Sequence, residues 1–290
     1  MTLTPEQHAE RLTGIGSSDA AVALGLNPYR APIELWQEKL GLEVEPFQGN
    51  QATKWGQLLE PAVRQEYAEQ TGRVVRLPTE TLHHPKHTFM LGHPDGVTDC
   101  GRLYEGKTAR YPDGWGEPGS DEIPQPYMVQ VQHLMIVTGL VVADVAVLIG
   151  GQDFRLYEIP ADPELQELIV DGEHEFWRHV ETRTAPAIDY NAPGALALVR
   201  KLYPGTNGGT EIADAMLEHW RAVYDQAIEY RDRYSAAADA AKAHLLYAMG
   251  ESAVLKFADG KVLRRREVKR KGFTVDPTSY IDARFASSKE

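Results

Sequence analysis

The sequence predicts an α/β (α+β) fold: a mixed central sheet flanked by helices, followed by a C-terminal appendage of one long helix and a small β-sheet. Three observations predict it. Apolar residues recur at helical spacing over residues 54–71 and 162–182. Residues 211–249 are rich in Ala and contain neither Gly nor Pro, as expected of one long helix or two packed ones. Five segments have strand character; they are 73–83, 89–97, 101–108, 141–149 and 154–159.

The N-terminal part is expected to be mainly helical. Residues 5–25 combine a short helical start, a Gly/Ser turn and a helix with Ser18 at its N-terminus. Pro32 begins the next helix. After a loop over 43–53, the helix 54–71 ends at Gly72.

The middle of the chain completes the core in the order α–β–β–β–α–β. A loop over 111–123 precedes a helix at 124–139. The following strand is apolar almost throughout, which is typical of a buried, partly parallel strand, and the next one alternates as its hairpin partner. The predicted domains are a core (1–183), a linker (184–210) and an appendage (211–290), in which residues 252–275 form a small sheet turning at Asp259-Gly260.

The composition is that of an ordinary globular protein and excludes several kinds of site. With 290 residues, 42% of them apolar, the chain is long enough to bury a core without disulfides. The single cysteine, Cys100, cannot make an internal disulfide, a four-thiolate zinc site or an iron–sulfur cluster, and it fits a reducing cytoplasm. No run of about 18 apolar residues predicts a membrane span, and the N-terminus lacks a secretion signal.

The net charge of −12 weighs against a nucleic-acid partner, because phosphate binding favours Lys and Arg. Local charge matters more, and residues 261–271 (KVLRRREVKRK) contain seven basic residues and one acid. This stretch is either a DNA-contacting strand or an exposed sheet edge protected by charge.

Four charged residues are candidates for chemistry. Asp95 lies in a Pro-Asp-Gly turn, and Glu105 and Lys107 lie within a strand, whose two-residue period puts them on one face. Burying such a pair is costly unless its charge is compensated, and a divalent metal would do so. Glu60, on the preceding helix, adds a carboxylate. Such a set suits phosphodiester hydrolysis, in which carboxylates hold Mg²⁺ and a lysine orients or deprotonates water, or balances charge.

Each feature also has an ordinary explanation. Pro-Asp-Gly is a common turn, Glu-x-Lys is usually an exposed salt bridge, and Glu60 alone would be a surface residue. The spacing of His83, His84 and His87 indicates a solvated hairpin rather than a metal cluster. The conjunction of the four charged residues, in this order and on these elements, favours a site.

The motifs together resemble the PD-(D/E)XK nuclease signature, through Gly-His-Pro-Asp-Gly (92–96) and Leu-Tyr-Glu-Gly-Lys-Thr (103–108). Further segments are similar to the YqaJ-like viral recombinases, the branch that includes the exonuclease of phage lambda. They are RLTGIGSSD (11–19), WGQLLE (55–60) and YMVQVQH (127–133). The resemblance covers roughly residues 8–182, implies a PD-(D/E)XK core there, and leaves 184–290 unexplained.

The resemblance also implies a role for each matching residue. Asp95, Glu105 and the Gly106 carbonyl would be metal ligands, and Glu60 would ligate a second metal or a metal-bound water. Lys107 would position the attacking water. Gln130 would contact the phosphate or the water near it, although helix packing is the alternative for Gln130, as it is for Tyr127.

A 5′-phosphate site is implied at Arg11, Ser17, Ser18 and His93. The chemistry agrees, because a helix N-terminus at Ser18 favours an anion and Arg11 offers a fork of donors. A simple N-cap is the alternative for Ser18. His93 departs from the lambda enzyme, which has Ser before its Pro-Asp, so one phosphate contact differs.

The implied activity is 5′-to-3′ exonuclease action on double-stranded DNA ends, of the phage recombination type, with Mg²⁺ or Mn²⁺ as cofactor. The implied setting is the cytoplasm of a bacterial host, with a phage or prophage gene. The implied assembly is a ring-shaped homo-oligomer, a trimer, acting with a single-strand annealing protein. Two alternatives remain: an endonuclease with the same metal site, and a non-catalytic DNA-binding protein of the same fold.

Overall fold

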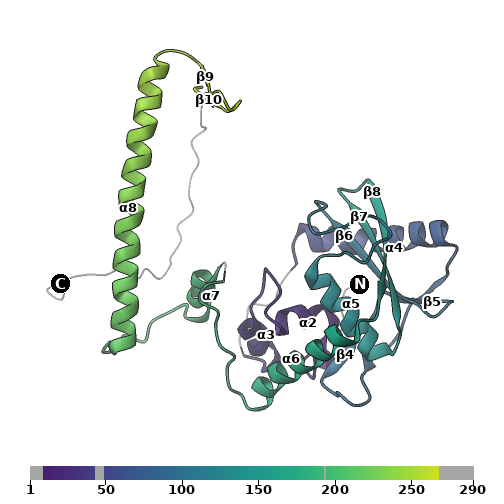
Figure 1. Cartoon of the computed structure of the whole chain (residues 1–290). Helices are drawn as coiled ribbons and strands as arrows, with labels where there is room; N and C mark the ends of the chain where they lie inside the picture. Colours follow the sequence, from purple (N-terminus) through teal and green to yellow (C-terminus); the bar gives the residue numbers. More distant parts are fainter. Residues whose placement is uncertain (1–8, 43–48, 193, 268–290) are drawn as a thin grey trace. The chain divides into compact units, whose positions relative to one another are not determined.

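The computed structural model describes residues 9–42, 49–192 and 194–267, and the chain divides into two compact units, Met1–Val199 and Arg200–Glu290 (Figure 1). The first unit holds a five-stranded mixed sheet, a three-stranded sheet and the helices around them, which confirms the predicted fold class. The boundary between the units falls within α7 (Ala195–Leu202), inside the stretch predicted as a linker. That helix was not predicted, because eight residues are too few to establish a helical period.

The larger sheet has the order β2-β5-β6-β7-β8. Its strands are β2 (Val75–Arg76), β5 (Gly96–Thr98), β6 (Leu103–Ala109), β7 (Val142–Ile149) and β8 (Asp153–Pro160). β6 and β7 run parallel, and the other neighbouring pairs are antiparallel. The parallel pair requires a crossover, which contains α5 (Gln125–Thr138). The predicted hairpin of β7 and β8 is confirmed.

Different helices cover the two faces of this sheet. Alternate residues of a strand point to opposite sides, so Leu103 of β6 packs in a cluster with α5, whereas Tyr104 packs with α4 (Gln51–Thr71). Glu105 and Lys107 share the parity of Leu103. They therefore lie on the α5 side, on one face as the sequence predicts.

The smaller sheet has the order β1-β4-β3 and shares a hydrophobic cluster with α5 and three further helices. Its elements are β1 (Ile15–Gly16), β3 (Leu82–His83) and β4 (Met90–Gly92), with α2 (Ser17–Ala23), α3 (Pro32–Lys39) and α6 (Pro163–Glu181). The two-residue β1 is too short to show alternation and was not predicted. A Cβ at Gly14 would lie 2.6 Å from the Phe89 carbonyl oxygen, so a glycine is needed for the chain to approach β4 this closely.

The structure corrects two predicted strands. Segment 73–83 is not continuous, because β2 and β3 belong to different sheets. Pro78 lies between them and has no N–H to donate to a ladder. Segment 89–97 is likewise divided into β4 and β5, with Pro94 between them. The turn that carries Asp95 therefore connects the two sheets.

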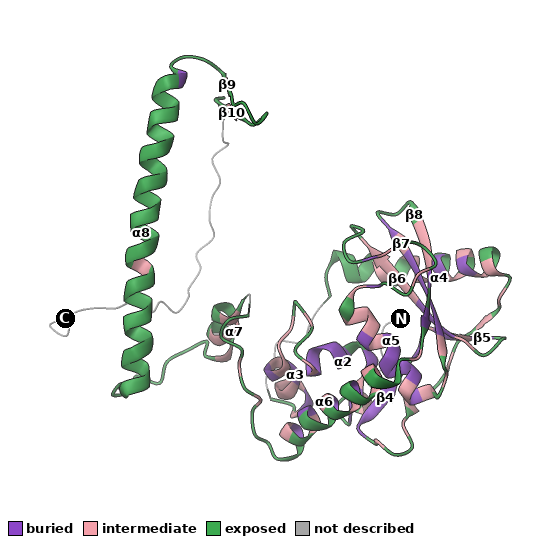
Figure 2. Cartoon of the chain, in the orientation of Figure 1, coloured by how far each residue is buried: buried purple, intermediate pink, exposed green. Residues whose placement is uncertain are grey.

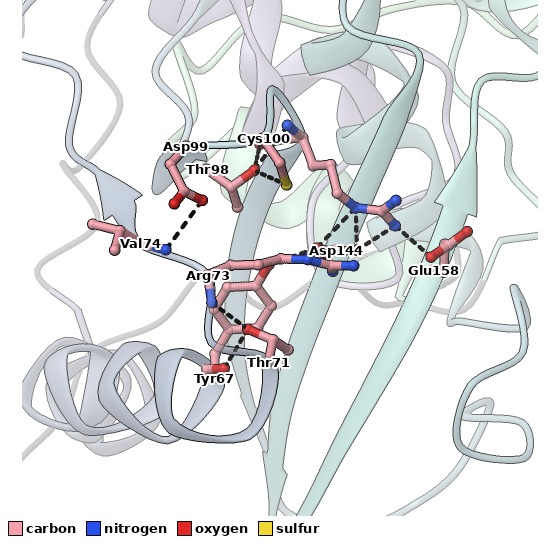
Figure 3. Close-up of polar contacts among 10 residues, drawn as sticks. Tyr67, Thr71, Arg73, Val74, Thr98, Asp99, Cys100, Asp144 and Glu158 are labelled. Carbon is pink, nitrogen blue, oxygen red and sulfur yellow. Dashed lines mark hydrogen bonds and ion pairs between the residues drawn. The ribbon is translucent and has the colours of Figure 1, made fainter.

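A buried ionic network fastens the end of α4 to the larger sheet (Figure 3). The carboxylate of Asp144 on β7 accepts hydrogen bonds from Tyr67 Oη at 2.5 Å, from Arg73 at 2.6 Å and from Arg102 at 2.6 Å. Burial and the bond to Asp144 raise the pKa of Tyr67 to about 12. The network borders a hollow of about 590 Å³ that contains none of the predicted site residues. The ionic network around Asp144 thus fixes α4, the helix that carries Glu60.

The second unit contains one continuous helix and a hairpin. α8 (Ala215–Met249) is a single helix of 35 residues, which excludes the alternative of two packed helices, and it ends at Gly250 as predicted. Figure 2 shows that most of α8 is exposed within the described chain. β9 (Val254–Lys256) and β10 (Val262–Arg264) pair around the predicted Asp259-Gly260 turn, and the rest of the predicted sheet, 268–275, lies outside the described residues. None of the described helices is long and apolar enough to cross a membrane.

Candidate active site

Most of the residues predicted for catalysis and for phosphate binding line one pocket of the first unit, with a volume of about 470 Å³. The predicted residues that line it are Arg11, Ser17, Ser18, Glu60, His93, Asp95, Glu105 and Gln130. Gly106 and Lys107 follow Glu105 in β6 and are not part of the lining. Segments far apart in the sequence, from the N-terminus to α5, thus contribute to a single site.

Glu105 is the central carboxylate of the pocket. It is only 2% exposed, and its Oε1 accepts hydrogen bonds from Lys107 Nζ at 2.5 Å and from Gln130 Nε2 at 2.7 Å. Its Oε2 is buried and has no hydrogen-bond partner within the described chain. Burial and the neighbouring charge of Asp95 raise the pKa of Glu105 to about 7. A buried carboxylate oxygen without a partner is costly, and a cation at Oε2 would remove that cost.

Asp95 is tied to β6 by its own side chain. Its Oδ2 accepts a hydrogen bond from the Gly106 backbone N–H at 3.0 Å. This bond brings the turn between the two sheets against the strand that carries Glu105. Two carboxylates held this close repel each other, which is the arrangement that a divalent cation stabilises.

The donor set fits a hard divalent ion. Mg²⁺ prefers oxygen ligands, commonly one or two carboxylates, and keeps several of its waters. Among the described residues, no group of three His, Cys, Asp or Glu side chains is placed to hold a metal. Asp95 and Glu105 line the pocket together and are the two carboxylates that could hold such an ion. Glu60 lines the same pocket and lies 3.8 Å from Arg64, so its predicted metal role stays a prediction.

Lys107 is enclosed by an anion and an aromatic ring. Besides its ion pair with Glu105, its Nζ lies 5.2 Å from the ring centroid of Tyr127 on α5. Burial would lower the pKa of Lys107, but the carboxylates of Glu105 and Asp95 outweigh it, and the net shift is upward. The ammonium therefore keeps its proton at neutral pH. The contact gives Tyr127 a place beside the site, which helix packing alone would not require.

Two of the residues predicted to bind a 5′ phosphate, Ser17 and Ser18, lie at the start of α2. Helix α2 begins at Ser17, and its N-cap is Gly16, so Ser18 is the second helical residue. Ser18 therefore lies in the first turn, at the helix N-terminus as predicted, whereas the alternative of a simple N-cap is wrong. Arg11 donates to Asp19 Oδ1 at 2.8 Å and keeps 33% of its side chain exposed.

Asp19 and Lys39 were not among the predicted site residues. Asp19 is 2% exposed and Lys39 is 6% exposed, and their side chains pair at 2.8 Å. Burial would raise the pKa of Asp19, but the charges of Lys39 and Arg11 outweigh it and the pKa is lowered. The sequence signal for Asp19 was its membership of the RLTGIGSSD motif. Lys39 gave none, because a lysine at the end of an amphipathic helix is expected to be exposed.

A second buried pair supports β4 from behind the pocket. His133 on α5 bonds Glu173 Oε1 through Nδ1 at 2.7 Å and the Leu91 carbonyl oxygen through Nε2 at 2.8 Å. Burial would lower the pKa of His133, but Glu173 outweighs it and the pKa is raised. The histidines of the predicted hairpin differ from the buried His133. His83 is exposed and pairs with Glu10, which agrees with the predicted solvated position.

Comparisons with known proteins show what the chain is similar to. Residues 7–141 match the family model of the YqaJ-like viral recombinase domain. The uncharacterized protein YqaJ of Bacillus subtilis (strain 168) is 38% identical over 208 residues, which are 70% of this chain and 64% of that relative's length.

The fold is similar to that of solved exonuclease structures. The alkaline exonuclease LHK-Exo of Laribacter hongkongensis superposes with a TM-score of 0.50 at 23% identity, covering 69% of this chain and 98% of that one. The same enzyme in complex with dAMP gives a TM-score of 0.50 at 24% identity, with the same coverage.

Proposed function

Because the chain carries a YqaJ-like viral recombinase domain on the fold of an alkaline exonuclease, we propose that it is a metal-dependent 5′-to-3′ exonuclease of double-stranded DNA. One observation carries the proposal. Glu105, whose Oε2 has no hydrogen-bond partner among the described residues, lines a pocket together with Asp95 and with the residues predicted to bind a 5′ phosphate. The relative's complex with dAMP supports a DNA nucleotide as the ligand.

We propose that Mg²⁺ or Mn²⁺ is held by Asp95 and Glu105. When bound, such an ion polarises the scissile phosphate and lowers the pKa of a water ligand. Neighbouring residues orient the two carboxylates toward the ion. The Gly106 N–H fixes the orientation of the Asp95 carboxylate, and Gln130 and Lys107 both bond Glu105 Oε1, which directs Oε2 to the ion.

Lys107 serves as an orienting cation in this proposal. Its raised pKa keeps the proton on Nζ, so the ammonium donates a hydrogen bond to the attacking water and balances the charge that develops on the phosphate. Deprotonation of the water by Lys107 is disfavoured, because the two carboxylates stabilise the charged form of the amine.

The 5′-to-3′ direction of digestion would follow from the residues of the pocket that are predicted to bind a 5′ phosphate. Arg11, Ser17, Ser18 and His93 line the same space as the two carboxylates. A 5′ phosphate held there would place a phosphodiester near Asp95 and Glu105 only when a DNA end is bound. The requirement for an end distinguishes an exonuclease from an endonuclease.

The test uses the full chain and three DNA substrates: a linear duplex with 5′ phosphates, the same duplex with 5′ hydroxyls, and a covalently closed circle. We expect Mg²⁺-dependent release of nucleotides, fastest from the phosphorylated duplex, and no cutting of the circle. Asp95→Ala should lower the rate by about 10²–10³-fold while the protein stays folded. Cutting of the circle would establish an endonuclease instead, and equal nucleotide release from wild type and Lys107→Ala would reject the catalytic site.

The assembly is also a proposal. By kinship with phage recombination exonucleases, we propose a ring-shaped trimer that acts with a single-strand annealing protein in the bacterial cytoplasm. Light scattering of the full chain measures its oligomeric state. A monomeric mass at the concentration used in the nuclease assay would contradict the proposed trimeric ring.

A further inference from the structure

The guanidinium of Arg11 is held by a buried cluster on α2 and α3. Asp19, almost fully buried, accepts hydrogen bonds from Arg11 at 2.8 Å and from Lys39 Nζ at 2.8 Å. Its Oδ1 also lies 3.8 Å from Arg30. One carboxylate thus organises three cations at the edge of the candidate active site.

Lys39 holds the same arginine from a different direction. Its Nζ donates a second hydrogen bond, at 2.7 Å, to the backbone carbonyl oxygen of Arg11. The Lys39 side chain is completely buried in its ion pair with Asp19, and a lysine is seldom buried unless its charge is paired. The backbone of Arg11 is therefore fixed by Lys39 while its side chain is fixed by Asp19.

The charged residues of the cluster carry a small positive excess. Arg30 is paired with Glu38, so two carboxylates stand against the three cations Arg11, Arg30 and Lys39. Only Arg11 among these five residues lines the pocket. A guanidinium has five N–H donors, and the bond to Asp19 uses one of them.

We propose that Asp19 and Lys39 are positioning residues that set the preference for a 5′-phosphorylated end by holding Arg11 in place before DNA binds. The proposal rests on the proposed function. An arginine normally loses rotamer freedom when it binds a phosphate, and a side chain already held by a buried carboxylate has lost that freedom beforehand. The cost of binding is then lower for a phosphorylated end and unaffected for a hydroxyl end.

The measured quantity is the ratio of kcat/KM on 5′-phosphorylated duplex to kcat/KM on the matching 5′-hydroxyl duplex, with Mg²⁺ present. The double variant Asp19→Asn with Lys39→Met removes both buried charges, so neither is left uncompensated. We expect the ratio to fall about tenfold, mainly through a higher KM for phosphorylated ends. Asp144→Asn is the matched control, because Asp144 is also a buried aspartate bound by arginines but lines a different pocket and does not contact Arg11; its ratio should not change.

A second variant covers the case in which the double variant does not fold. Lys39→Met alone leaves Asp19 paired with Arg11 and should lower the ratio by a smaller factor. An unchanged ratio in a folded variant, with both rates falling equally, would overturn the proposal and leave Asp19 and Lys39 a structural role. Arg11→Ala distinguishes failure of the phosphate site from failure of the proposed nuclease function. If Arg11→Ala leaves the ratio unchanged while Asp95→Ala abolishes cleavage, the phosphate site is refuted but the nuclease activity is not.

Discussion

The raised pKa of Glu105 makes a quantitative prediction about metal binding. The pKa rises from its ordinary value of 4.5 to about 7, because the carboxyl is buried beside Asp95. At about 1.4 kcal/mol for each pKa unit, ionising this group in the metal-free protein costs roughly 3 kcal/mol more than in water. Glu105 therefore holds a proton in the folded protein at pH values where the unfolded chain has released it, and it destabilises the fold as the pH rises through this window.

A metal must displace that proton. The apparent Kd for Mg²⁺ should therefore rise about tenfold for each pH unit below the folded pKa and level off above it. Calorimetric titration of the full chain with Mg²⁺, without DNA, at about pH 5.5 and about pH 8 measures the slope. Binding at the lower pH should also release close to one proton, which repeating the titration in buffers of different ionisation enthalpy reveals.

Two variants identify the group responsible. Glu105→Gln should bind Mg²⁺ weakly and lose the pH slope, whereas Glu173→Gln, which alters a buried carboxylate outside the pocket, should keep it. Equal affinity at both pH values in the wild type, or the same slope in Glu105→Gln, would refute the assignment of Oε2 to the metal.

Tyr127→Leu should lower kcat on linear duplex about tenfold, and Tyr127→Phe should restore it, because Lys107 Nζ lies over the ring; equal losses in both variants would contradict this. Glu173→Gln should lower the free energy of unfolding by about 3 kcal/mol, measured by urea titration. That stabilisation should be full below pH 6.5 and lost as the pH rises through the raised pKa of His133. Arg264→Gln should reduce the slope of log K against log salt for metal-free duplex binding by about 1; no change would favour the alternative that this basic strand protects a sheet edge.

The elements that the sequence predicts well are those with a long, unbroken pattern. α4, α5, α6 and the β7–β8 hairpin agree with the predicted segments to within a few residues. α5, α6 and β7 bury residues along most of their length, and α4 buries Val63 and Tyr67, so the period of each element is visible in its own residues. The elements that were predicted wrongly or missed are short, or are segments divided between the two sheets. β1 exists only because its backbone pairs with β4, and the divided strands follow from prolines whose effect depends on which sheet each half joins.

The candidate site was predictable to the extent that its residues conflict with their local pattern. Glu105 and Lys107 are charges in a strand that otherwise builds the core, and this conflict is visible without coordinates. Lys39 shows no such conflict, because it ends a helix where a lysine is ordinary. Its burial arises from partners 20 and 28 residues away in the chain, and tertiary contacts of that kind leave no trace in local composition.

The two charge clusters are opposite in sign and share one pocket. On one side, the two carboxylates of Asp95 and Glu105 stand beside one ammonium, that of Lys107. The side formed by Arg11 has a positive excess, because three cations meet two carboxylates there. A DNA strand brings two successive phosphates. In the proposed function, Arg11 would bind one of them directly, whereas Asp95 and Glu105 would bind the next through a cation. Binding of the end and loading of the metal should therefore be coupled, each improving the affinity of the other by the same factor.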